Sequence, residues 1–441
     1  MKRIVLASSV SALWQGRHRF LRALRVYLGI LLSSRRLAKQ IRSGAYSRDG
    51  ISALQHKVHT ENAQRLFQLF QDNGGTWIKA GQCLSGRPDF LPPEYIEALQ
   101  PLQNNVAPLP FHHIEPALIR HWGEHWRDRF SKFDEVPVAS ASIAQVYKAS
   151  LPDGTQVAIK ILIPGIHALY EQDLVLYRIL ARVLATLLPQ LDVVGTVRVF
   201  LDSLQQELDF IQEARNVTAF GQLPHLPRVR SLTLLPDLSN ADIVTTEWVE
   251  GTTLVEYLRQ ASPDTRYELL SLLQHSYIQQ VIRFGTFQGD AHPGNYLIDQ
   301  DGNLVFVDFG YLGSLSDRER LSYINLILAT IDGDARSLQM ALRDGGFNCL
   351  LDDLFSSRLL ELFHTCTRKE GQNIQFHQVE KMVQEVLDSI RQRRANVPAH
   401  YLVTGRVFVT LTGLFKLFGV VPERIDIRAI LLSTQPTTDT K

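Results

Sequence analysis

The stretch that decides the fold runs from residue 288 to residue 310. It opens with Gln288-Gly289-Asp290-Ala291-His292-Pro293-Gly294-Asn295 and closes with the apolar run Leu304-Val305-Phe306-Val307 followed by Asp308-Phe309-Gly310. Mg2+ prefers hard oxygen ligands, which an aspartate carboxylate and an asparagine carbonyl supply. We therefore predict that Asn295 and Asp308 are metal ligands at the end of a strand, and that Asp290 lies where an attacking hydroxyl or water arrives.

This order of residues is the parts list of a kinase catalytic centre, in which Mg2+ neutralises the charge on the phosphates of ATP. The Asp-Phe-Gly motif alone is weak evidence for a kinase site, since the same three residues also form an ordinary turn after a strand. The separation of thirteen residues between Asn295 and Asp308, with Asp290 upstream, makes the combination much more specific. The sequence therefore predicts phosphoryl-transfer chemistry with ATP.

A candidate phosphate-binding lysine lies upstream. An alternating run from Ser142 to Ala149 and the run Val157-Ala158-Ile159-Lys160 flank the turn signal Pro152-Asp153-Gly154, a pattern typical of strand, turn and strand. Lys160 stands near the end of the second strand, where kinases keep the lysine that binds phosphates. A solvent-facing lysine on an edge strand is the alternative.

An acidic helix is predicted over residues 197–216. Its apolar residues recur at helical spacing, namely Phe200, Leu204, Leu208 and Ile211. Asp209 and Glu213 are four residues apart and would share a helix face, whereas Glu207 lies on a different side. Glu213 is the preferred partner of Lys160 and Glu207 is the runner-up, while solvated acids are the alternative.

Two parts of a nucleotide site are assigned by order alone. Residues 243–251 predict a strand that leaves into a linker, where the backbone around Glu247 and Val249 would bind adenine. The G-x-G-x-x-G loop of protein kinases is absent; at its position stand Ala139, Ser140, Ala141 and Ser142. Because Cβ atoms restrict the backbone that glycine leaves open, this loop either holds nucleotide differently, with serine hydroxyls, or is an ordinary strand lead-in.

Together these residues resemble the UbiB (AarF-like) family of atypical protein-kinase-like proteins. The family's own signature stands before the kinase core, at Lys79-Ala80-Gly81-Gln82 and its continuation to Pro92. The loop at 139–142, the acidic residues 207–216 and the run 290–295 also match. The resemblance covers roughly residues 20 to 425.

The resemblance implies an ATP-binding, kinase-like fold that does not phosphorylate proteins in the usual way. Lys79 and Gln82 would project from an inserted helix over the active site, with Lys79 paired to Glu207 or Asp209, and this cover would block a peptide substrate. The remaining roles carried over are phosphate binding by Lys160, its orientation by Glu213, catalysis by Asp290, and Mg2+ binding by Asn295 and Asp308.

The resemblance also implies an ATPase or small-molecule kinase that supports isoprenoid quinone (ubiquinone-type) biosynthesis or membrane lipid handling. Its partners would be a small lipid-like molecule or quinone precursor and enzymes of lipid biosynthesis. The alternative is a nucleotide-gated scaffold of a lipid-biosynthetic complex without turnover. The intact set of Lys160, Asp290, Asn295 and Asp308 speaks against an inert protein, whereas the Ala/Ser loop and the covering helix speak for slow or no turnover.

Two departures from the family pattern stand out. The family usually has His-Ala-Asp-Pro-His where this chain has Gln288-Gly289-Asp290-Ala291-His292, and Ser140 replaces an alanine of the loop. Neither change removes a metal ligand. Both bear on the rate or the nucleotide preference, so nucleotide binding is a firmer expectation than turnover.

Charge is distributed unevenly along the 441 residues. The formal net charge is +1, but residues 1–48 hold eleven lysines and arginines and no acid. Within them, the apolar and arginine-containing segment Phe20–Leu32 is too short and too charged to span a bilayer, and it suits an anionic membrane surface. An organelle transit peptide and a structural helix packed on the kinase core are the alternatives. The rest of the chain is acidic and the basic segment lacks a nucleic-acid-binding motif, which argues against nucleic acid as a partner.

We expect an α+β, two-lobed protein-kinase-like fold with a helical N-terminal extension that covers the active site. The predicted parts are a basic segment at 1–45, a helical extension at 46–130, an N-lobe at 131–251, a helical C-lobe at 252–425 and a tail at 426–441. The apolar run at 407–415 is bounded by Arg406 and Lys416 and predicts a buried helix rather than a membrane span. We expect a peripheral protein on the cytoplasmic face of a membrane.

Overall fold

The computed structural model of the chain describes residues 2–44, 46–85, 91–103, 108–187, 193–347, 353–366, 398–422 and 430. Residues 86–90 of the Lys79 signature and the tail from residue 431 lie outside this part of the chain. The chain divides into two compact units, one of residues 1–212 and 235–248 and a second of residues 213–234 and 249–441. Helices and sheets are both present, which confirms the predicted α+β class.

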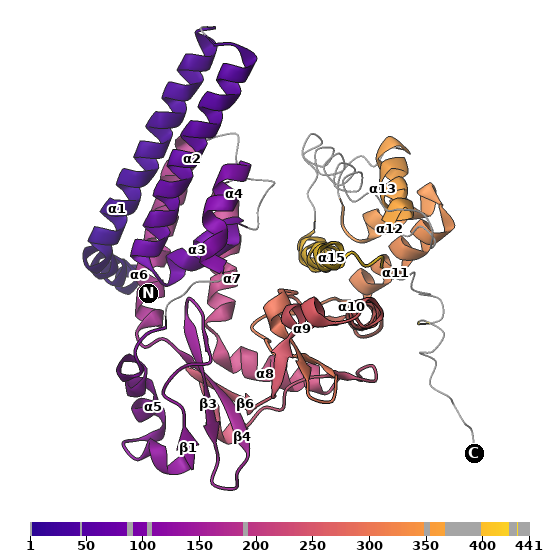
Figure 1. Cartoon of the computed structure of the whole chain (residues 1–441). Coiled ribbons are helices and arrows are strands. Elements are labelled where there is room, and N and C mark those ends of the chain that lie inside the picture. Colours follow the sequence, from indigo (N-terminus) through magenta and orange to yellow (C-terminus); the bar gives the residue numbers. More distant parts are fainter. Residues whose placement is uncertain are drawn as a thin grey trace. The chain divides into compact units, whose positions relative to one another are not determined.

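The first unit opens with a long helical hairpin of α1 (Lys2–Arg42) and α2 (Arg48–Asn73), seen in indigo in Figure 1. Ser47 caps α2 by accepting a hydrogen bond from the Gly50 amide, and Gly74 ends the helix with a φ of 63°. Four further helices pack beside the hairpin: α3 (Thr76–Ser85), α4 (Pro93–Leu99), α6 (Ile166–Leu187) and α7 (Val193–Glu207). Their shared core is built around Phe70, Trp77 and Leu99, which are fully buried.

One face of α1 packs within this unit. Ala23 is fully buried, and Phe20, Tyr27 and Ile30 pack against the same core. Structural packing, which was one interpretation of the segment 20–32, therefore holds for this face.

A buried carboxylate joins three of these helices. Asp173 on α6 is fully buried and accepts hydrogen bonds from Arg19 Nη2 on α1 (2.8 Å), from Trp77 Nε1 on α3 (3.0 Å) and from the Thr76 hydroxyl. Burial raises the pKa of this carboxyl group. The start of α3, the helix that carries Lys79, is therefore fixed to α1 and α6.

An antiparallel sheet forms the other part of the first unit. The strands β1 (Lys132–Phe133), β3 (Ala144–Ser150), β4 (Gln156–Leu162) and β6 (Ile243–Glu247) lie in that order, and β2 (Ala139–Ser140) also pairs with β3. This confirms the predicted strand, turn and strand around Asp153, whose carboxylate accepts from the Thr155 amide at 2.9 Å.

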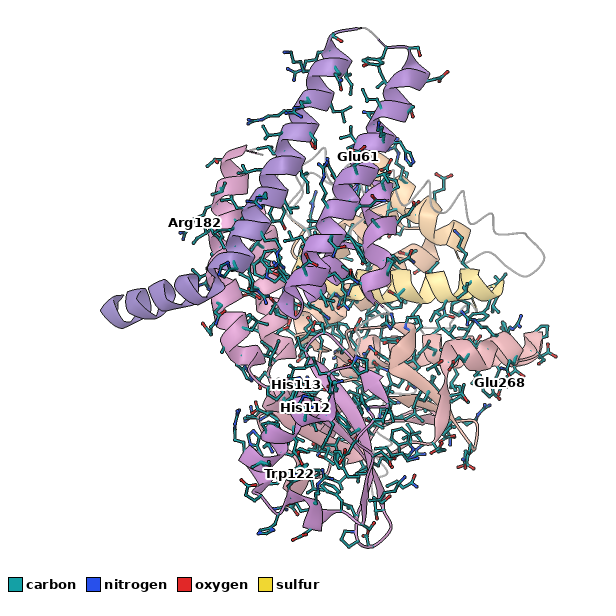
Figure 2. All side chains as sticks on the ribbon, turned by 60° about the vertical axis from the view of Figure 1, so that its left-hand side comes forward. Glu61, His112, His113, Trp122, Arg182 and Glu268 are labelled. Carbon is teal, nitrogen blue, oxygen red and sulfur yellow. The ribbon has the colours of Figure 1, made fainter. Side chains whose placement is uncertain are left out.

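Short helices cover one face of this sheet. They are η2 (Phe111–His113), α5 (Glu115–Trp122) and η3 (Trp126–Arg129), and Figure 2 labels His112, His113 and Trp122 on them. The alternate residues Val157, Ile159 and Ile161 of β4 are fully buried against this layer. Because successive side chains of a strand point to opposite faces, Lys160 lies on the other face of the sheet.

The second unit combines helices with short strands. Its helices include α9 (Leu254–Gln260), α10 (Pro263–Ile278), the π-helical turn η5 (Gln279–Phe284), α11 (Asp317–Asp332), α12 (Ala335–Asp344), α13 (Asp353–Cys366) and α15 (Ala399–Phe418). One sheet has the order β5 (Val229–Arg230), β10 (Leu304–Phe306), β9 (Tyr296–Asp299), β7 (Gly251–Thr253). A second pairs β11 (Leu312–Ser314) with β8 (Thr286–Gln288).

The C-terminal apolar run lies inside α15. Val407, Leu411 and Phe415 are buried in the main core of the second unit, as predicted for a buried helix. Among the described residues, no helix combines the length and apolar character needed to cross a bilayer. In the sequence, apolar residues from Val379 to Ile390 recur at helical spacing and predict a further helix, but this segment lies outside the described part of the chain.

The predicted single helix over residues 197–216 is wrong. The chain leaves α7 at Glu207, and a new helix, α8 (Phe210–Gly221), begins three residues later. The Asp209 carboxylate accepts from the Gln212 amide at 2.9 Å, so this residue caps α8 instead of sharing a helix face with Glu213. The apolar spacing continues across the break in the sequence, but its last member, Ile211 on α8, is exposed, so the pattern did not mark one buried helix face.

Candidate functional site

Two strands of the second unit place the predicted metal ligands together. β9 and β10 are antiparallel, with Tyr296 opposite Phe306. The residues just beyond this pair are Asn295 and Val307, and the Val307 amide donates to the Asn295 carbonyl at 3.0 Å. Asn295 therefore lies at the end of the hairpin where the chain reaches Asp308.

The loop before β9 holds Asp290 beside Asn295. The Asn295 side-chain amide donates to the Asp290 carbonyl at 2.9 Å and lies 3.4 Å from its carboxylate Oδ2. His292 caps the 3-10 turn η6 (Pro293–Asn295), since its Nδ1 accepts from the Gly294 amide at 3.1 Å. On the other segment, Asp308 Oδ1 accepts from the Gly310 amide at 2.9 Å. Local hydrogen bonds thus orient all three predicted residues.

The pair Asn295 and Asp308 suits Mg2+ that is bound together with a nucleotide better than it suits a metal ion coordinated by protein side chains alone. Within the described ranges, no group of three or more histidine, cysteine or acidic side chains is placed to hold a metal. Mg2+ in nucleotide sites is bound by one or two protein ligands, with phosphate oxygens and water completing the coordination. Asn295 and Asp308 would supply that number of ligands.

Residues of α8 support the Asp-Phe-Gly segment. The buried Asn216 side chain donates to the Phe309 carbonyl at 2.9 Å. Glu213 lies one turn earlier and is buried too. Asn216 was part of the matched motif, but no role was predicted for it. The pairing of Glu213 with Lys160 stays a prediction, because the two residues belong to different units.

The lysine half of the site lies in the first unit. Lys160 is on the central strand β4, opposite Val146 of β3 and Val244 of β6. Its ammonium nitrogen lies 5.4 Å from the centre of the Phe210 ring, within the range of a cation–π contact. Strand pairing on both sides fixes the backbone of this lysine.

The Ala/Ser loop forms a tight hairpin beside that lysine strand. Ala139 and Ser140 make up β2 and pair with β3, and the Ala141 amide donates to the Ala144 carbonyl at 2.8 Å. Ser142 is buried, whereas Ala141 is exposed. Of the two adenine candidates, Glu247 ends β6 opposite Val157, and Val249 begins the next segment of the second unit. Their contacts with nucleotide stay predictions.

The Lys79 signature makes two contacts in the first unit. Lys79 Nζ lies 2.7 Å from Glu207 Oε1, so Glu207 and not Asp209 is the acid that the resemblance predicted for it. The Gln82 side-chain amide donates to the Leu102 carbonyl at 2.8 Å. A Cβ on Gly81 would lie 2.3 Å from Leu102 Cδ1 and 2.7 Å from Phe70 Cδ2, so only glycine fits there. Helix α3 is therefore held along its length.

Position 289, directly before Asp290, also requires glycine. The ring of Tyr311 lies against Gly289, where a Cβ would approach Tyr311 Cδ1 to 2.2 Å. The Gly289 amide donates to the Tyr311 carbonyl at 3.0 Å, and Arg406 of α15 donates to the Gly289 carbonyl at 2.9 Å. The sequence showed Gly289 only as a departure from the family pattern, and no local signal pointed to Arg406 or Tyr311.

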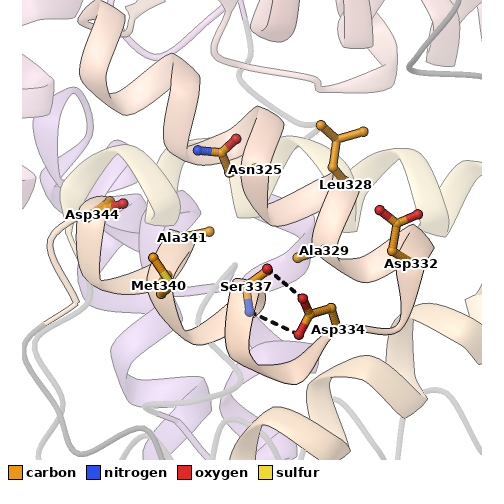
Figure 3. A pocket seen from close by; sticks show the side chains of 9 residues that line it. All are labelled: Asn325, Leu328, Ala329, Asp332, Asp334, Ser337, Met340, Ala341 and Asp344. Carbon is orange, nitrogen blue, oxygen red and sulfur yellow. Dashed lines mark hydrogen bonds between the residues drawn. The ribbon is translucent and has the colours of Figure 1, made fainter.

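A separate pocket lies between α11 and α12, away from these residues in the sequence (Figure 3). Asp332, Asp334 and Asp344 are among its lining residues. Asp334 caps α12, since its carboxylate accepts from the Ser337 hydroxyl at 2.7 Å and from two amides. Helix capping explains this acid without a ligand.

Comparison with known proteins identifies the family. The ABC1 atypical kinase-like domain matches residues 101–342. The chain belongs to the ABC1 family, also known as UbiB or AarF-like. The Synechocystis protein slr0889 is 32% identical to this ABC1 protein over 373 residues, which are 79% of this chain and 88% of the relative. The predicted family and its kinase-like fold with a helical N-terminal region are confirmed.

Other ABC1 relatives differ more in length. AarF domain-containing protein kinase 1 of Xenopus laevis is 27% identical over 83% of this chain and 72% of the relative. The chloroplastic protein Activity of BC1 Complex Kinase 3 of Arabidopsis thaliana is 32% identical, but the match spans 40% of its length. The solved complex of Rv3197 with erythromycin from Mycobacterium tuberculosis is 28% identical, with a TM-score of 0.59 over 85% of this chain and 95% of that one.

The contact between Gly289 and Tyr311 can be tested in this ABC1 protein. Gly289→Ala should lower the free energy of unfolding by about 1–3 kcal/mol, because the new methyl group overlaps the Tyr311 ring. In a Tyr311→Ala background the same Gly289→Ala change should cost less, because the ring that it overlaps is absent. Chemical denaturation of the single and double variants measures the coupling energy.

Gly413→Ala in α15 is the matched control, since nothing lies within 4 Å of a Cβ there and the change should not destabilise the protein. If the effects of Gly289→Ala and Tyr311→Ala on the free energy of unfolding were strictly additive, the steric explanation would be contradicted.

Proposed function

We propose that this ABC1 protein binds ATP with Mg2+ and transfers its terminal phosphoryl group to water or to a small lipid-related acceptor. Family membership supports the use of ATP. The observation that carries the rest is the β9–β10 hairpin, which holds Asn295 at the end where Asp308 emerges and keeps Asp290 hydrogen-bonded to Asn295. Lys160 lies in the first unit, and Asp290, Asn295 and Asp308 lie in the second.

Each residue has a distinct part in this mechanism. Asn295 and Asp308 would hold Mg2+, which would supply positive charge to neutralise the phosphates. Lys160 would bind the phosphates, and Glu213 would orient that lysine. Asp290 would accept the proton of the attacking hydroxyl or water.

Two features support a small acceptor rather than a protein. Only the short strand β11 (Leu312–Ser314) separates Gly310 from α11, so the chain has no long activation loop at this point. The helix that carries Lys79 is anchored at Asp173, Glu207 and Leu102, which favours a fixed element over a mobile lid. We therefore propose a quinone precursor or another lipid-like molecule as the acceptor, with enzymes of lipid biosynthesis as partners.

The metal role of Asp308 gives a direct test. Asp308→Asn should abolish Mg2+-dependent binding of ATP, because it removes the one carboxylate of the proposed ligand pair. Titration calorimetry with and without Mg2+ measures the affinity. Asp301→Asn, in the exposed turn after β9, is the control and should bind as the wild type does. Equal affinity of Asp308→Asn and wild type would exclude the metal role.

Asp290 separates an enzyme from a nucleotide-gated scaffold. Asp290→Asn should keep nucleotide binding within about threefold, but phosphate release should fall by at least about 100-fold, the range of a lost general base. The assay is phosphate release with liposomes and phenolic quinone precursors present. Wild-type protein that binds ATP yet releases no phosphate under these conditions would instead support the scaffold.

The outer face of α1 supports membrane contact. Leu21, Leu28 and Leu32 are exposed at helical spacing, and Arg25 and Arg35 are exposed between and beyond them. Exposed leucines that alternate with arginines suit the interface of an anionic bilayer. We propose peripheral binding to the cytoplasmic face of a membrane through this face, with an organelle membrane as the equivalent site in a eukaryote.

Reversing charge on this face should weaken vesicle binding. A lysine or arginine near an anionic surface contributes about 1 kcal/mol, so Arg25→Glu with Arg35→Glu should reduce binding at least about tenfold. Sedimentation with phosphatidylglycerol-containing vesicles measures it. Lys57→Glu on α2 with Arg318→Glu on α11, two exposed positions that do not belong to this face, is the control with the same change in net charge. An equal loss in both variants would show that total charge, and not this face, governs binding.

A further inference from the structure

The amide of Gln288 touches both acidic segments of the site. Gln288 ends β8 and is fully buried. Its side-chain nitrogen Nε2 lies 2.7 Å from the Asp290 carbonyl oxygen and 3.3 Å from the Asp308 carbonyl oxygen. One NH2 group thus bridges the loop before β9 and the segment after β10, which are otherwise joined through the hairpin.

The orientation of this amide follows from its partners. Carbonyl oxygens only accept hydrogen bonds, so the NH2 end must face Asp290 and Asp308. The amide oxygen then accepts from the Tyr277 hydroxyl at 2.5 Å. This hydrogen bond uses the single hydroxyl proton of Tyr277. The hydroxyl of Tyr296, 2.7 Å away, must therefore donate to the Tyr277 oxygen. Burial raises the pKa of Tyr277 well above its usual value, which keeps the phenol protonated.

The backbone of Gln288 is held by a second neutral side chain. The Gln288 amide N–H donates to Gln280 Oε1 at 3.0 Å, and Gln280 Nε2 donates to the Ser276 hydroxyl at 3.0 Å. Gln280 lies in the π-helical turn η5, and both residues are buried. Such turns commonly place side chains at functional sites. Gln288 is therefore fixed at both its backbone and its side chain by uncharged groups.

We propose that Gln288 is a positioning residue that sets the spacing between Asp290 and Asp308. Its two N–H hydrogens hold the two carbonyl oxygens at once, and the tyrosine pair behind it prevents the amide from rotating. This inference rests on the proposed function for its catalytic consequence, but the bridge itself is a property of the folded chain.

Three substitutions separate this role from simple core packing. Gln288→Leu keeps the approximate volume and removes both donors. Gln288→His keeps a ring N–H donor for one carbonyl. Gln288→Glu presents carboxylate oxygens to two carbonyl oxygens, which repel it. The two acidic segments should be held most tightly in the wild type, less tightly in Gln288→His and least tightly in Gln288→Leu. In Gln288→Glu they should be at least as loosely held as in Gln288→Leu.

Hydrogen-exchange mass spectrometry on the full chain without nucleotide tests the bridge itself. In Gln288→Leu, exchange should accelerate at least about tenfold, both in peptides that contain Asp290–Asn295 and in peptides that contain Asp308–Gly310, relative to those of α12. Gln288→His should reverse part of this change. Thr330→Val, which removes a buried hydroxyl bond of α11 in the same unit, is the control. Unchanged exchange in either segment of Gln288→Leu would overturn the proposal.

The Mg2+ requirement for ADP binding tests the functional consequence. Loss of a residue that orients metal ligands commonly costs about 10–100-fold in metal affinity, so Gln288→Leu should need at least about tenfold more Mg2+, with partial rescue in Gln288→His. A Leu variant with the wild-type Mg2+ requirement would overturn the positioning role. Wild-type protein that binds no Mg-ADP would contradict the proposed function alone, because the exchange experiment still decides whether the bridge exists.

Discussion

The register of two short strands is the constraint on which the site depends. Tyr296, Ile298, Leu304 and Phe306 are all buried in the core of the second unit, so β9 and β10 have apolar side chains that must stay inside. A slip of one residue would move every side chain to the opposite face of the strand. Core packing therefore fixes the register, and the register decides which residues stand at the open end of the hairpin. The positions of the site residues are in this sense specified by side chains buried in the core of the second unit.

The two units anchor their functional segments by different physical means. In the first unit a buried carboxylate, Asp173, collects an arginine, a tryptophan and a threonine at the start of α3. In the second unit the supporting side chains Tyr277, Gln280 and Gln288 are uncharged. Desolvating a charge costs far more than desolvating an amide, but a paired charge is also a stronger anchor. The Lys79 helix is thus held by ionic contacts, whereas the acidic loops are held mainly by neutral side chains, with one charged donor, Arg406, on the Gly289 carbonyl.

The sequence predicted those parts of the site that depend on residues close together in the chain. The spacing from Asp290 to Asp308 and the alternation before Lys160 were local, and strand pairing confirmed the elements that carry them. The break between α7 and α8 was missed because apolar spacing continued across Leu208, and a capping carboxylate looks like any other acid in sequence. The contacts of Arg406 and Gln288 join segments that only folding brings together, so no pattern could reveal them.

The fit between Gly289 and the Tyr311 ring limits the order in which this site can change over generations. A side chain at position 289 overlaps the ring for as long as Tyr311 is present. A small residue must therefore appear at position 311 before an alanine at position 289 is tolerated. A substitution that is harmless in one relative would then be harmful in another, so activity data from related chains should be transferred at this position only together with the identity of residue 311.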